Sequence, residues 1–238
     1  MTAVWHVGTV AETRRETATG RSIVLDVPGW SGNIAGQHVD VRLTAEDGYQ
    51  AVRSYSLASS GGGERLQLAV DKLPDGEVSP YLVDDIMTGD QLELRGPLGG
   101  WFVWRPDLID SVQLIAGGSG IVPLMAMIRA HTEAVSAAPF RLLYSVRQPD
   151  DAFFRPELDT PAPGVDITWL YTRTAPEGWD RPAGRVTAAD LAALAFPASE
   201  SPAIFVCGPT GFVEAVASAL VGLGHDPARI KTERFGGK

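Results

Sequence analysis

The sequence of 238 residues contains one cysteine, Cys207, and four histidines that are scattered along the chain. A single cysteine excludes an intramolecular disulfide, a zinc site built from cysteines and a Cys₄ iron–sulfur cluster within this chain. The histidines show no metal-ligand spacing, so no metal site is predicted. If the protein carries out redox chemistry, an organic cofactor has to supply it.

Excess positive charge and long apolar runs are also missing. The formal net charge of −9 argues against nucleic acid as a partner, because phosphate binding needs a basic surface. No apolar run approaches the roughly 18 to 20 residues that cross a bilayer. The opening segment MTAVWHVGTV lacks the basic and then apolar order of a signal peptide. We therefore expect a cytoplasmic protein without a membrane or nucleic-acid partner, and we also expect a monomer.

The first part of the chain has short apolar runs separated by turn-forming residues such as Pro28-Gly29 and Asp47-Gly48. Six short strands at this spacing predict an antiparallel barrel or sandwich. One short helix is expected near Ser79–Asp85, with Ser79 as its N-cap and Pro80 at its first position. The predicted strands are Val4–Val10, Ile23–Val27, His38–Leu43, Arg53–Leu57, Leu66–Val70 and Gln91–Arg95.

After about Asp110 the pattern changes to continuously apolar strands that alternate with helices. The strands are VQLIAGG, FRLLYSVR, DITWLYTR and AIFVCG, and the helices include one at Ala188–Leu194 capped by Thr187. This alternation is typical of a parallel doubly wound sheet that is covered on both faces. We place the join in GPLGGWFVWRPD and expect domains at residues 1–104 and 105–238.

Ligands of such sheets bind at the carboxyl ends of the strands, where two glycine-rich turns are predicted. In AGGSGIVP, residues 116–123, free backbone N–H groups can face a pyrophosphate. VCGPTGF, residues 206–212, follows a later strand in the same way. Each could equally be a tight turn without a ligand, and Cys207 a small buried apolar residue. GPLGGWF, residues 96–102, could be no more than an interdomain turn.

The order of these segments is more specific than any one of them. RSYS, residues 53–56, precedes GPLGGWF, then GGSGIVP and finally CGPTGF. This order resembles the ferredoxin–NADP reductase family of FAD-dependent oxidoreductases, and the likeness covers nearly the whole chain. The resemblance implies an N-terminal six-stranded antiparallel β-barrel for FAD and a C-terminal Rossmann-like parallel α/β domain for NAD(P).

The resemblance also implies roles for the residues that face FAD. Arg53 would pair with the pyrophosphate, Tyr55 would lie against the isoalloxazine ring, and Ser56 would place its hydroxyl near flavin N5. In VDKLPDGEVSPYL, backbone would follow the ribityl chain, and the turn before the short helix would hold the pyrophosphate. Phe235 looks like an aromatic shield of the site, although packing on the core is an alternative. The predicted FAD residues are Arg53, Ser54, Tyr55, Ser56, Val70, Lys72, Gly76, Glu77, Val78, Ser79 and Phe235.

The nucleotide site is expected at the strand ends, and Ser56, Cys207 and Glu233 are the predicted catalytic residues. Arginines after the α/β strands favour NADPH over NADH, because guanidinium groups bind a 2′-phosphate bidentately. No acidic residue occupies positions 172 or 173 to bind a ribose 2′-hydroxyl. The predicted residues for NADP are Gly117, Gly118, Gly120, Arg147, Thr172, Arg173, Arg185, Cys207, Gly208 and Pro209.

The resemblance implies that hydride passes from NADPH, with NADH as the alternative coenzyme, to FAD and that single electrons then leave the flavin. Because one cysteine cannot hold an iron–sulfur cluster, the acceptor is expected to be a separate ferredoxin or iron–sulfur oxygenase component. Two alternatives stay open. The protein could be a free-flavin reductase of the same superfamily, or a non-catalytic regulatory subunit that binds nucleotide.

Overall fold

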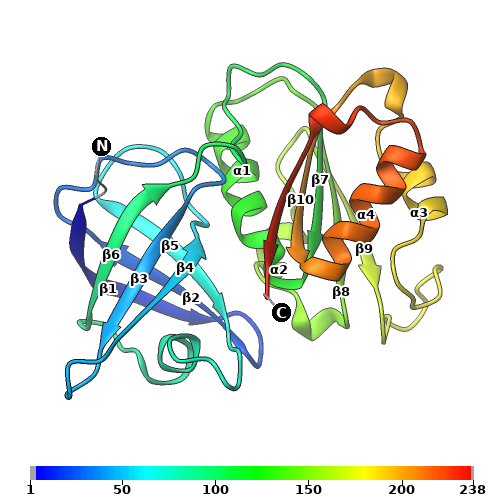
Figure 1. Cartoon of the computed structure of the whole chain (residues 1–238). Helices are drawn as coiled ribbons and strands as arrows, with labels where there is room; N and C mark the ends of the chain where they lie inside the picture. The colour runs from blue at the N-terminus through cyan, green and yellow to red at the C-terminus, as the bar shows by residue number, and fades with distance from the viewer. Residues whose placement is uncertain (1–3, 237–238) are drawn as a thin grey trace.

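The computed structural model describes residues 4–236, which form two sheets side by side (Figure 1). The first is a six-stranded antiparallel sheet in the order β4-β3-β6-β1-β2-β5. All six strands predicted in the first part of the chain are present, although β1 and β6 end later and β2 and β4 begin earlier than expected. The strands are β1 Trp5–Arg15, β2 Gly20–Asp26, β3 His38–Thr44, β4 Gln50–Ser56, β5 Arg65–Asp71 and β6 Gln91–Leu98.

This sheet closes on itself to form a barrel. Leu57, which follows β4, bridges to Leu68 of β5, and the amide of Ala58 donates to the carbonyl of Gln67 at 2.8 Å. Alternate side chains of the strands, such as Ile23 and Leu25, are fully buried inside. The apolar face of each strand therefore builds one closed core, and the antiparallel barrel expected from the family resemblance is confirmed.

The short helix near residue 80 has the predicted span, but the predicted cap is absent. Residues 79–80 are helical and continue into a π-helical turn, η1 (Tyr81–Asp85). The Ser79 hydroxyl accepts a hydrogen bond from the Leu73 amide at 3.0 Å and makes no cap hydrogen bond. The predicted cap is wrong because the loop that precedes the helix has already engaged that hydroxyl.

The second sheet has five parallel strands in the order β11-β10-β7-β8-β9. Helix α1 covers the face toward the barrel, and α3 and α4 cover the other face (Figure 1). Every residue of β7 is buried because its alternate side chains enter cores on opposite faces. The strands are β7 Val112–Gly117, β8 Phe140–Val146, β9 Val165–Tyr171, β10 Ala203–Pro209 and β11 Ile230–Phe235, and the helices are α1 Ile121–Glu133, α2 Arg155–Leu158, α3 Ala188–Leu194 and α4 Thr210–Gly222.

Helix α3 has the predicted bounds and the predicted cap. Thr187 accepts a hydrogen bond from the amide of Asp190 at 3.2 Å, and the Asp190 carboxylate accepts one from the Thr187 amide at 2.8 Å. Two unpaired helix donors are thus satisfied reciprocally. The segment at the predicted domain join packs against both domains, since Trp104 lies in the second core and its amide donates to Ala35.

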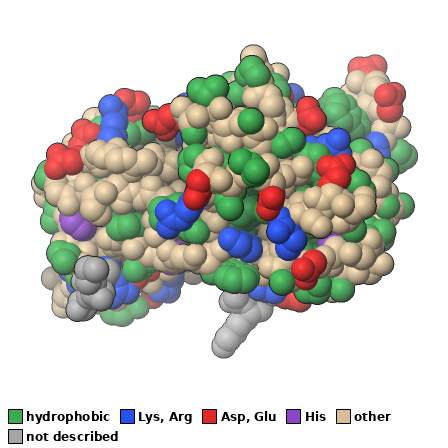
Figure 2. All heavy atoms as spheres, turned by 90° about the horizontal axis from the view of Figure 1, so that it is seen from above, with side chains coloured by type: hydrophobic (Ala, Val, Ile, Leu, Met, Phe, Trp, Pro, Cys, Tyr) green, Lys and Arg blue, Asp and Glu red, His purple; other side chains and the backbone are tan. Residues whose placement is uncertain are grey.

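The strands of the second sheet all point toward one end of the molecule, next to the barrel (Figure 1). Figure 2 views the opposite end, where acidic, basic and apolar side chains are mixed without a large area of one sign. Among residues 4–236, no helix has the length and apolar character needed to cross a membrane. The cavities described next lie at the end toward which the strands point.

Candidate active site

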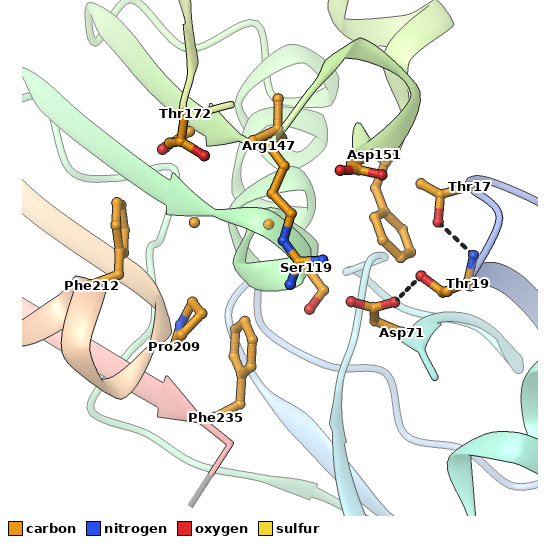
Figure 3. A pocket seen from close by; sticks show the side chains of 15 residues that line it. Thr17, Thr19, Asp71, Ser119, Arg147, Asp151, Thr172, Pro209, Phe212 and Phe235 are labelled. Carbon is orange, nitrogen blue, oxygen red and sulfur yellow. Dashed lines mark hydrogen bonds between the residues drawn. The ribbon is translucent and has the colours of Figure 1, made fainter. Parts of the chain in front are cut away.

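Three adjoining cavities lie where the barrel meets the carboxyl ends of the parallel strands. The first, the barrel cavity, has a volume of about 430 Å³ and is lined by residues 53–56, the turn 76–79 and Ser119. The second, the strand-end cavity, lies between the two domains (Figure 3). The third, the junction cavity, is lined by His38, Ser54, Ser56 and residues 233–235. Phe235 lines all three cavities, so β11 ends at their meeting point.

Most of the predicted site residues line one of these cavities, and some do not. The residues that do are Arg53, Ser54, Tyr55, Ser56, Gly76, Glu77, Val78, Ser79, Gly117, Gly118, Arg147, Thr172, Pro209, Glu233 and Phe235. Those outside the linings are Val70, Lys72, Gly120, Arg173, Arg185, Cys207 and Gly208. The Val70 side chain is in the barrel core, and Lys72 pairs with Asp84 at 2.9 Å.

The positive charge of the barrel cavity comes from Arg53, whose guanidinium forms an ion pair with the Glu77 carboxylate. Glu77 also accepts a hydrogen bond from the Tyr49 hydroxyl at 2.7 Å. Within residues 4–236, the amides of Glu77 and Val78 donate to no protein acceptor. A half-exposed guanidinium therefore lines the same cavity as the two residues whose amides are unpaired, and such groups are donors of the kind that a pyrophosphate binds.

The turn that carries these amides is held tightly. A Cβ atom on Gly76 would lie 2.8 Å from the Ser79 hydroxyl oxygen, which is itself bound to Leu73. Only glycine fits this turn without moving Ser79. The turn geometry and the donors fit FAD, although Glu77 must release Arg53 before an anion can use that guanidinium.

Tyr55 and the serines beside it occupy different environments. Burial raises the pKa of Tyr55 to about 12, so its ring is a neutral, flat wall of the barrel cavity. The Ser54 hydroxyl donates to Asp40 at 2.6 Å. Burial alone would raise the pKa of Asp40, but hydrogen bonds from Ser54 and Arg95 outweigh it and hold that pKa below its usual value. Ser56 pairs across the sheet with His38 and lines the junction cavity with it.

The glycines at the strand ends are explained mainly by packing. A Cβ atom on Gly117 or Gly208 would lie 2.7 or 2.8 Å from the Phe212 ring, and one on Gly120 would collide with the Cys207 carbonyl. Gly118 is different, because it has a φ of 55° and open space where a Cβ would lie. Gly118 therefore brings bare backbone to the strand-end cavity.

Cys207 and Glu233 are neighbours across β10 and β11. Cys207 is buried, and burial together with the nearby Glu233 charge raises the pKa of its thiol well above the usual value. The thiol is therefore protonated at neutral pH. Burial raises the pKa of Glu233 to about 7, and its Oε2 atom has no hydrogen-bond partner among the described residues. An orphaned carboxyl oxygen beside a cavity can hold or accept a proton.

Of the three arginines predicted to bind the coenzyme, only Arg147 lines the strand-end cavity among the described residues, whereas Arg173 and Arg185 lie outside it. Arg147 and Thr172 line the strand-end cavity, and the Arg147 side chain points toward Ser119 (Figure 3). Arg173 is exposed, and its amide donates to the Arg147 carbonyl at 2.9 Å, so it lies next to that cavity. Arg185 is exposed in the segment before α3.

The structure adds cavity residues that sequence reasoning missed. The barrel side of the strand-end cavity is formed by Thr17, Thr19 and Asp71, and the Thr19 hydroxyl donates to Asp71 at 2.7 Å (Figure 3). The other side adds Ser119 and Phe212. The latter two lie inside the glycine motifs and could have been read from them. Thr17 and Thr19 belong to a polar hairpin turn that carries no such signal.

Comparison with known proteins agrees with this arrangement. The chain matches the oxidoreductase FAD-binding domain family over residues 18–103 and the oxidoreductase NAD-binding domain family over residues 114–218. The crystal structure of the flavohem-like FAD/NAD-binding domain of nitric oxide dioxygenase from Vibrio cholerae superposes with a TM-score of 0.86 at 27% identity. That likeness covers 98% of this chain and 99% of that one.

Two curated relatives extend the likeness at the level of sequence. NADH-cytochrome b5 reductase 1 of Emericella nidulans is 32% identical over 205 residues, which is 82% of this chain and 65% of the relative. The glycine betaine monooxygenase reductase subunit of Pseudomonas aeruginosa is 31% identical over 206 residues, which is 84% of this chain and 56% of the relative. The chain thus spans less than two thirds of the length of either. With both domain families and the fold in agreement, the chain belongs to the ferredoxin–NADP reductase-like family of FAD- and NAD-binding oxidoreductases.

Proposed function

We propose that this chain accepts hydride from NADPH on bound FAD and delivers single electrons to a separate protein. The observation that carries the proposal is the meeting of the barrel, junction and strand-end cavities at Phe235, with FAD-type donors on one side and strand ends on the other. When bound, FAD supplies the step between two-electron and one-electron chemistry that no side chain here provides.

In this proposal the barrel residues hold the cofactor. Arg53, the amides of Glu77 and Val78, and the Ser79 hydroxyl bind the pyrophosphate, with the backbone of residues 70–72 alongside the ribityl chain. Tyr55 offers its neutral ring to the isoalloxazine, and Phe235 covers the site from the other domain. The support is that the side chains of Arg53, Tyr55 and Phe235 line one cavity.

The second domain binds the nucleotide and excludes water. Gly117, Gly118 and Gly120 shape the first strand end, while Cys207, Gly208 and Pro209 border the nicotinamide. Ser56 and Glu233 are proposed to face the reacting atoms from opposite domains, since both line the junction cavity. A carboxyl with a pKa of about 7 holds a proton part of the time at neutral pH.

The coenzyme is proposed to be NADPH, bound at its 2′-phosphate by Arg147, Thr172, Arg173 and Arg185. One relative carries NADH in its name. An NADH site is expected to have a carboxylate that binds the ribose 2′-hydroxyl. This chain instead has a hydroxyl and a guanidinium at positions 172 and 173, which favours NADPH. Kinetics with both coenzymes decide this point.

The electron acceptor is proposed to be a ferredoxin or an iron–sulfur oxygenase component. The names of the relatives include a monooxygenase reductase subunit and a cytochrome b5 reductase. The single cysteine places any iron–sulfur centre outside the 238 residues of this chain. We propose that the chain divides into domains at residues 1–104 and 105–238.

Anaerobic titration of the purified protein with NADPH and with NADH, followed in the flavin absorption band, tests the proposal. We expect a yellow protein that keeps its flavin through extensive dialysis and is bleached by NADPH. Complete loss of flavin on dialysis, with turnover of added FAD or FMN, would indicate a free-flavin reductase instead. Retained flavin that neither coenzyme bleaches would indicate a non-catalytic nucleotide-binding subunit.

A further inference from the structure

A buried carboxylate that is not among the predicted site residues joins the two domains. Glu16 lies at the end of β1, and its side chain is 3% exposed. Its Oε1 atom accepts hydrogen bonds from Arg14 at 2.6 Å and from Ser22 at 2.5 Å, both within the barrel. Its Oε2 atom accepts one from the amide of Phe154 at 3.0 Å, in the other domain. A buried charge is costly unless all its partners are kept, so this link resists separation.

The residue that receives this link has a strained backbone. Phe154 is fully buried and has a φ of 56°, which a bulky side chain rarely adopts. The neighbouring Phe153 ring packs so closely on the barrel hairpin that a Cβ atom on Gly20 would collide with it. The surroundings therefore hold the turn 153–154 in one conformation against the hairpin.

A second polar link reaches the same turn from α1. Arg129 donates to the Ala58 carbonyl and to the Gln67 side chain, each at 2.8 Å, and both acceptors belong to the barrel. The same guanidinium pairs with Glu157 of α2 at 2.7 Å and lies 5.0 Å from the centre of the Phe154 ring. We call Glu16, Arg129, Phe154 and Glu157 the interdomain clasp.

The clasp is directly connected to the strand-end cavity. Glu16 precedes Thr17, and the hairpin turn at Thr17 and Thr19 forms the barrel wall of that cavity (Figure 3). Phe153 lines the same cavity from the other domain. Any shift of the hairpin relative to the turn 153–154 therefore changes the distance between the two walls.

We infer that the interdomain clasp is a positioning device, which sets how closely the nucleotide domain approaches the flavin domain. The inference rests on the proposed function, because it concerns the approach of nucleotide to FAD. Small displacements of reacting groups are costly to rate, so the clasp affects hydride transfer without touching either cofactor.

The test compares Glu16→Ala with two matched variants of the FAD-loaded protein. Glu16→Gln keeps an acceptor oxygen for the Phe154 amide, and Ser22→Ala removes a Glu16 partner that lies only within the barrel. We expect Glu16→Ala to bind FAD within twofold of the parent affinity but to be reduced by saturating NADPH at least tenfold more slowly. Glu16→Gln should recover most of that loss, and Ser22→Ala should stay within threefold of the parent.

Hydrogen exchange gives a readout that does not depend on activity. The peptide containing Phe153–Glu157 should exchange faster in Glu16→Ala than in the parent or in Ser22→Ala. Faster exchange with an unchanged reduction rate would overturn the inference, as would equal rate losses in Glu16→Ala and Ser22→Ala. If Glu16→Ala does not fold, Arg129→Met tests the second link by the same two measurements. If NADPH does not reduce the parent protein, the proposed function has failed, and unchanged exchange in Glu16→Ala would separately refute the clasp.

Discussion

The barrel and the parallel α/β domain face the same cavities but contribute different kinds of groups. On the barrel side, charged and hydroxyl side chains meet the cavity, and partners already hold them, as Glu77 holds Arg53 and Asp71 holds Thr19. On the α/β side, Gly117 and Gly208 make room for the Phe212 ring. The barrel side therefore offers donors that are already paired, whereas the α/β side combines Arg147 and Thr172 in the strand-end cavity with glycines whose space the Phe212 ring fills. The comparison teaches that a motif glycine beside a ligand site can be required by its own protein packing.

The largest expected effect concerns Glu233, an α/β residue placed against the barrel. Its pKa of about 7 in the folded protein lies above the usual carboxyl value of about 4.5 because of burial. The folded state then binds the proton more tightly, so this group makes stability fall as pH rises from about 4.5 to about 7. Glu233→Gln should remove that loss. The free energy of unfolding of the variant, relative to that of the parent, should therefore rise by roughly 2–3 kcal/mol from pH 5 to pH 8. Urea unfolding of the flavin-free proteins at both pH values measures it.

A difference between Glu233→Gln and the parent that does not change between pH 5 and pH 8 would show that Glu233 ionises normally. Glu214→Gln is the control. Glu214 lies on α4, is exposed and forms an ion pair with Arg234. Its substitution should have the same small effect at both pH values.

Arg53→Ala removes the one guanidinium that lines the barrel cavity among residues 4–236. A charge-assisted hydrogen bond is worth on the order of 1.5–3 kcal/mol, so FAD affinity should fall about 10- to 150-fold. Quenching of flavin fluorescence on binding measures the dissociation constant.

Two further variants are compared with Arg53→Ala, one as a control and one that is expected to have the opposite effect. Arg65→Ala, which removes an exposed barrel arginine paired with Glu12, should leave FAD binding unchanged. Glu77→Gln should release Arg53 and tighten FAD binding. A full complement of FAD with unchanged affinity in Arg53→Ala would refute the pyrophosphate role.

Gly120→Ala tests whether the strand-end glycines serve packing. Its Cβ would collide with the Cys207 carbonyl, and overpacking of this kind typically costs about 1–3 kcal/mol. Gly211→Ala is the matched control, since its Cβ would meet nothing within 4 Å in helix α4. Thermal unfolding should show a lower midpoint for the first variant and an equal or higher one for the second. Equal midpoints would mean that the turn yields easily.

Arg173→Ala separates the coenzymes on the α/β side. Loss of one charged hydrogen bond to a 2′-phosphate should raise the KM for NADPH at least tenfold, which corresponds to about 1.4 kcal/mol. The KM for NADH should stay close to that of the parent. Steady-state kinetics with both coenzymes provide the measurement. An equal rise in KM for both coenzymes would mean that Arg173 contacts a part of the dinucleotide that NADPH and NADH share. A parent enzyme that is faster with NADH would refute the preference for NADPH.

The smallest expected effect is that of Cys207→Ser. The thiol is protonated and buried, so we propose that it positions the nicotinamide and forms no bond with it. FAD binding should be unchanged, and flavin reduction at saturating NADPH should slow by a few-fold because of a small displacement. Stopped-flow absorbance under anaerobic conditions measures this rate. An unchanged rate would return Cys207 to the role of a buried apolar residue.

Local sequence signals were sufficient for most of the elements. Helix α3 has its predicted bounds because Thr187 and Asp190 form a capping box, which involves only neighbouring residues. The predicted cap at Ser79 failed because its hydroxyl is bound to Leu73, a contact determined by the loop between them. The polar end of β1 was missed because pairing with β2 stabilises it in place of an apolar pattern.

What the sequence by itself determined is the class of each half, the order of the motifs and the family, since periodicity and turn chemistry act over short distances. Only the tertiary structure decided which residues meet. Glu16 and Phe154 are 138 positions apart, and Thr17 and Phe153 line one cavity from different domains. Such contacts depend on how the two cores pack together. The cost of closing a long loop depends mainly on its length, so the residues within the loop carry no local pattern that predicts the contact.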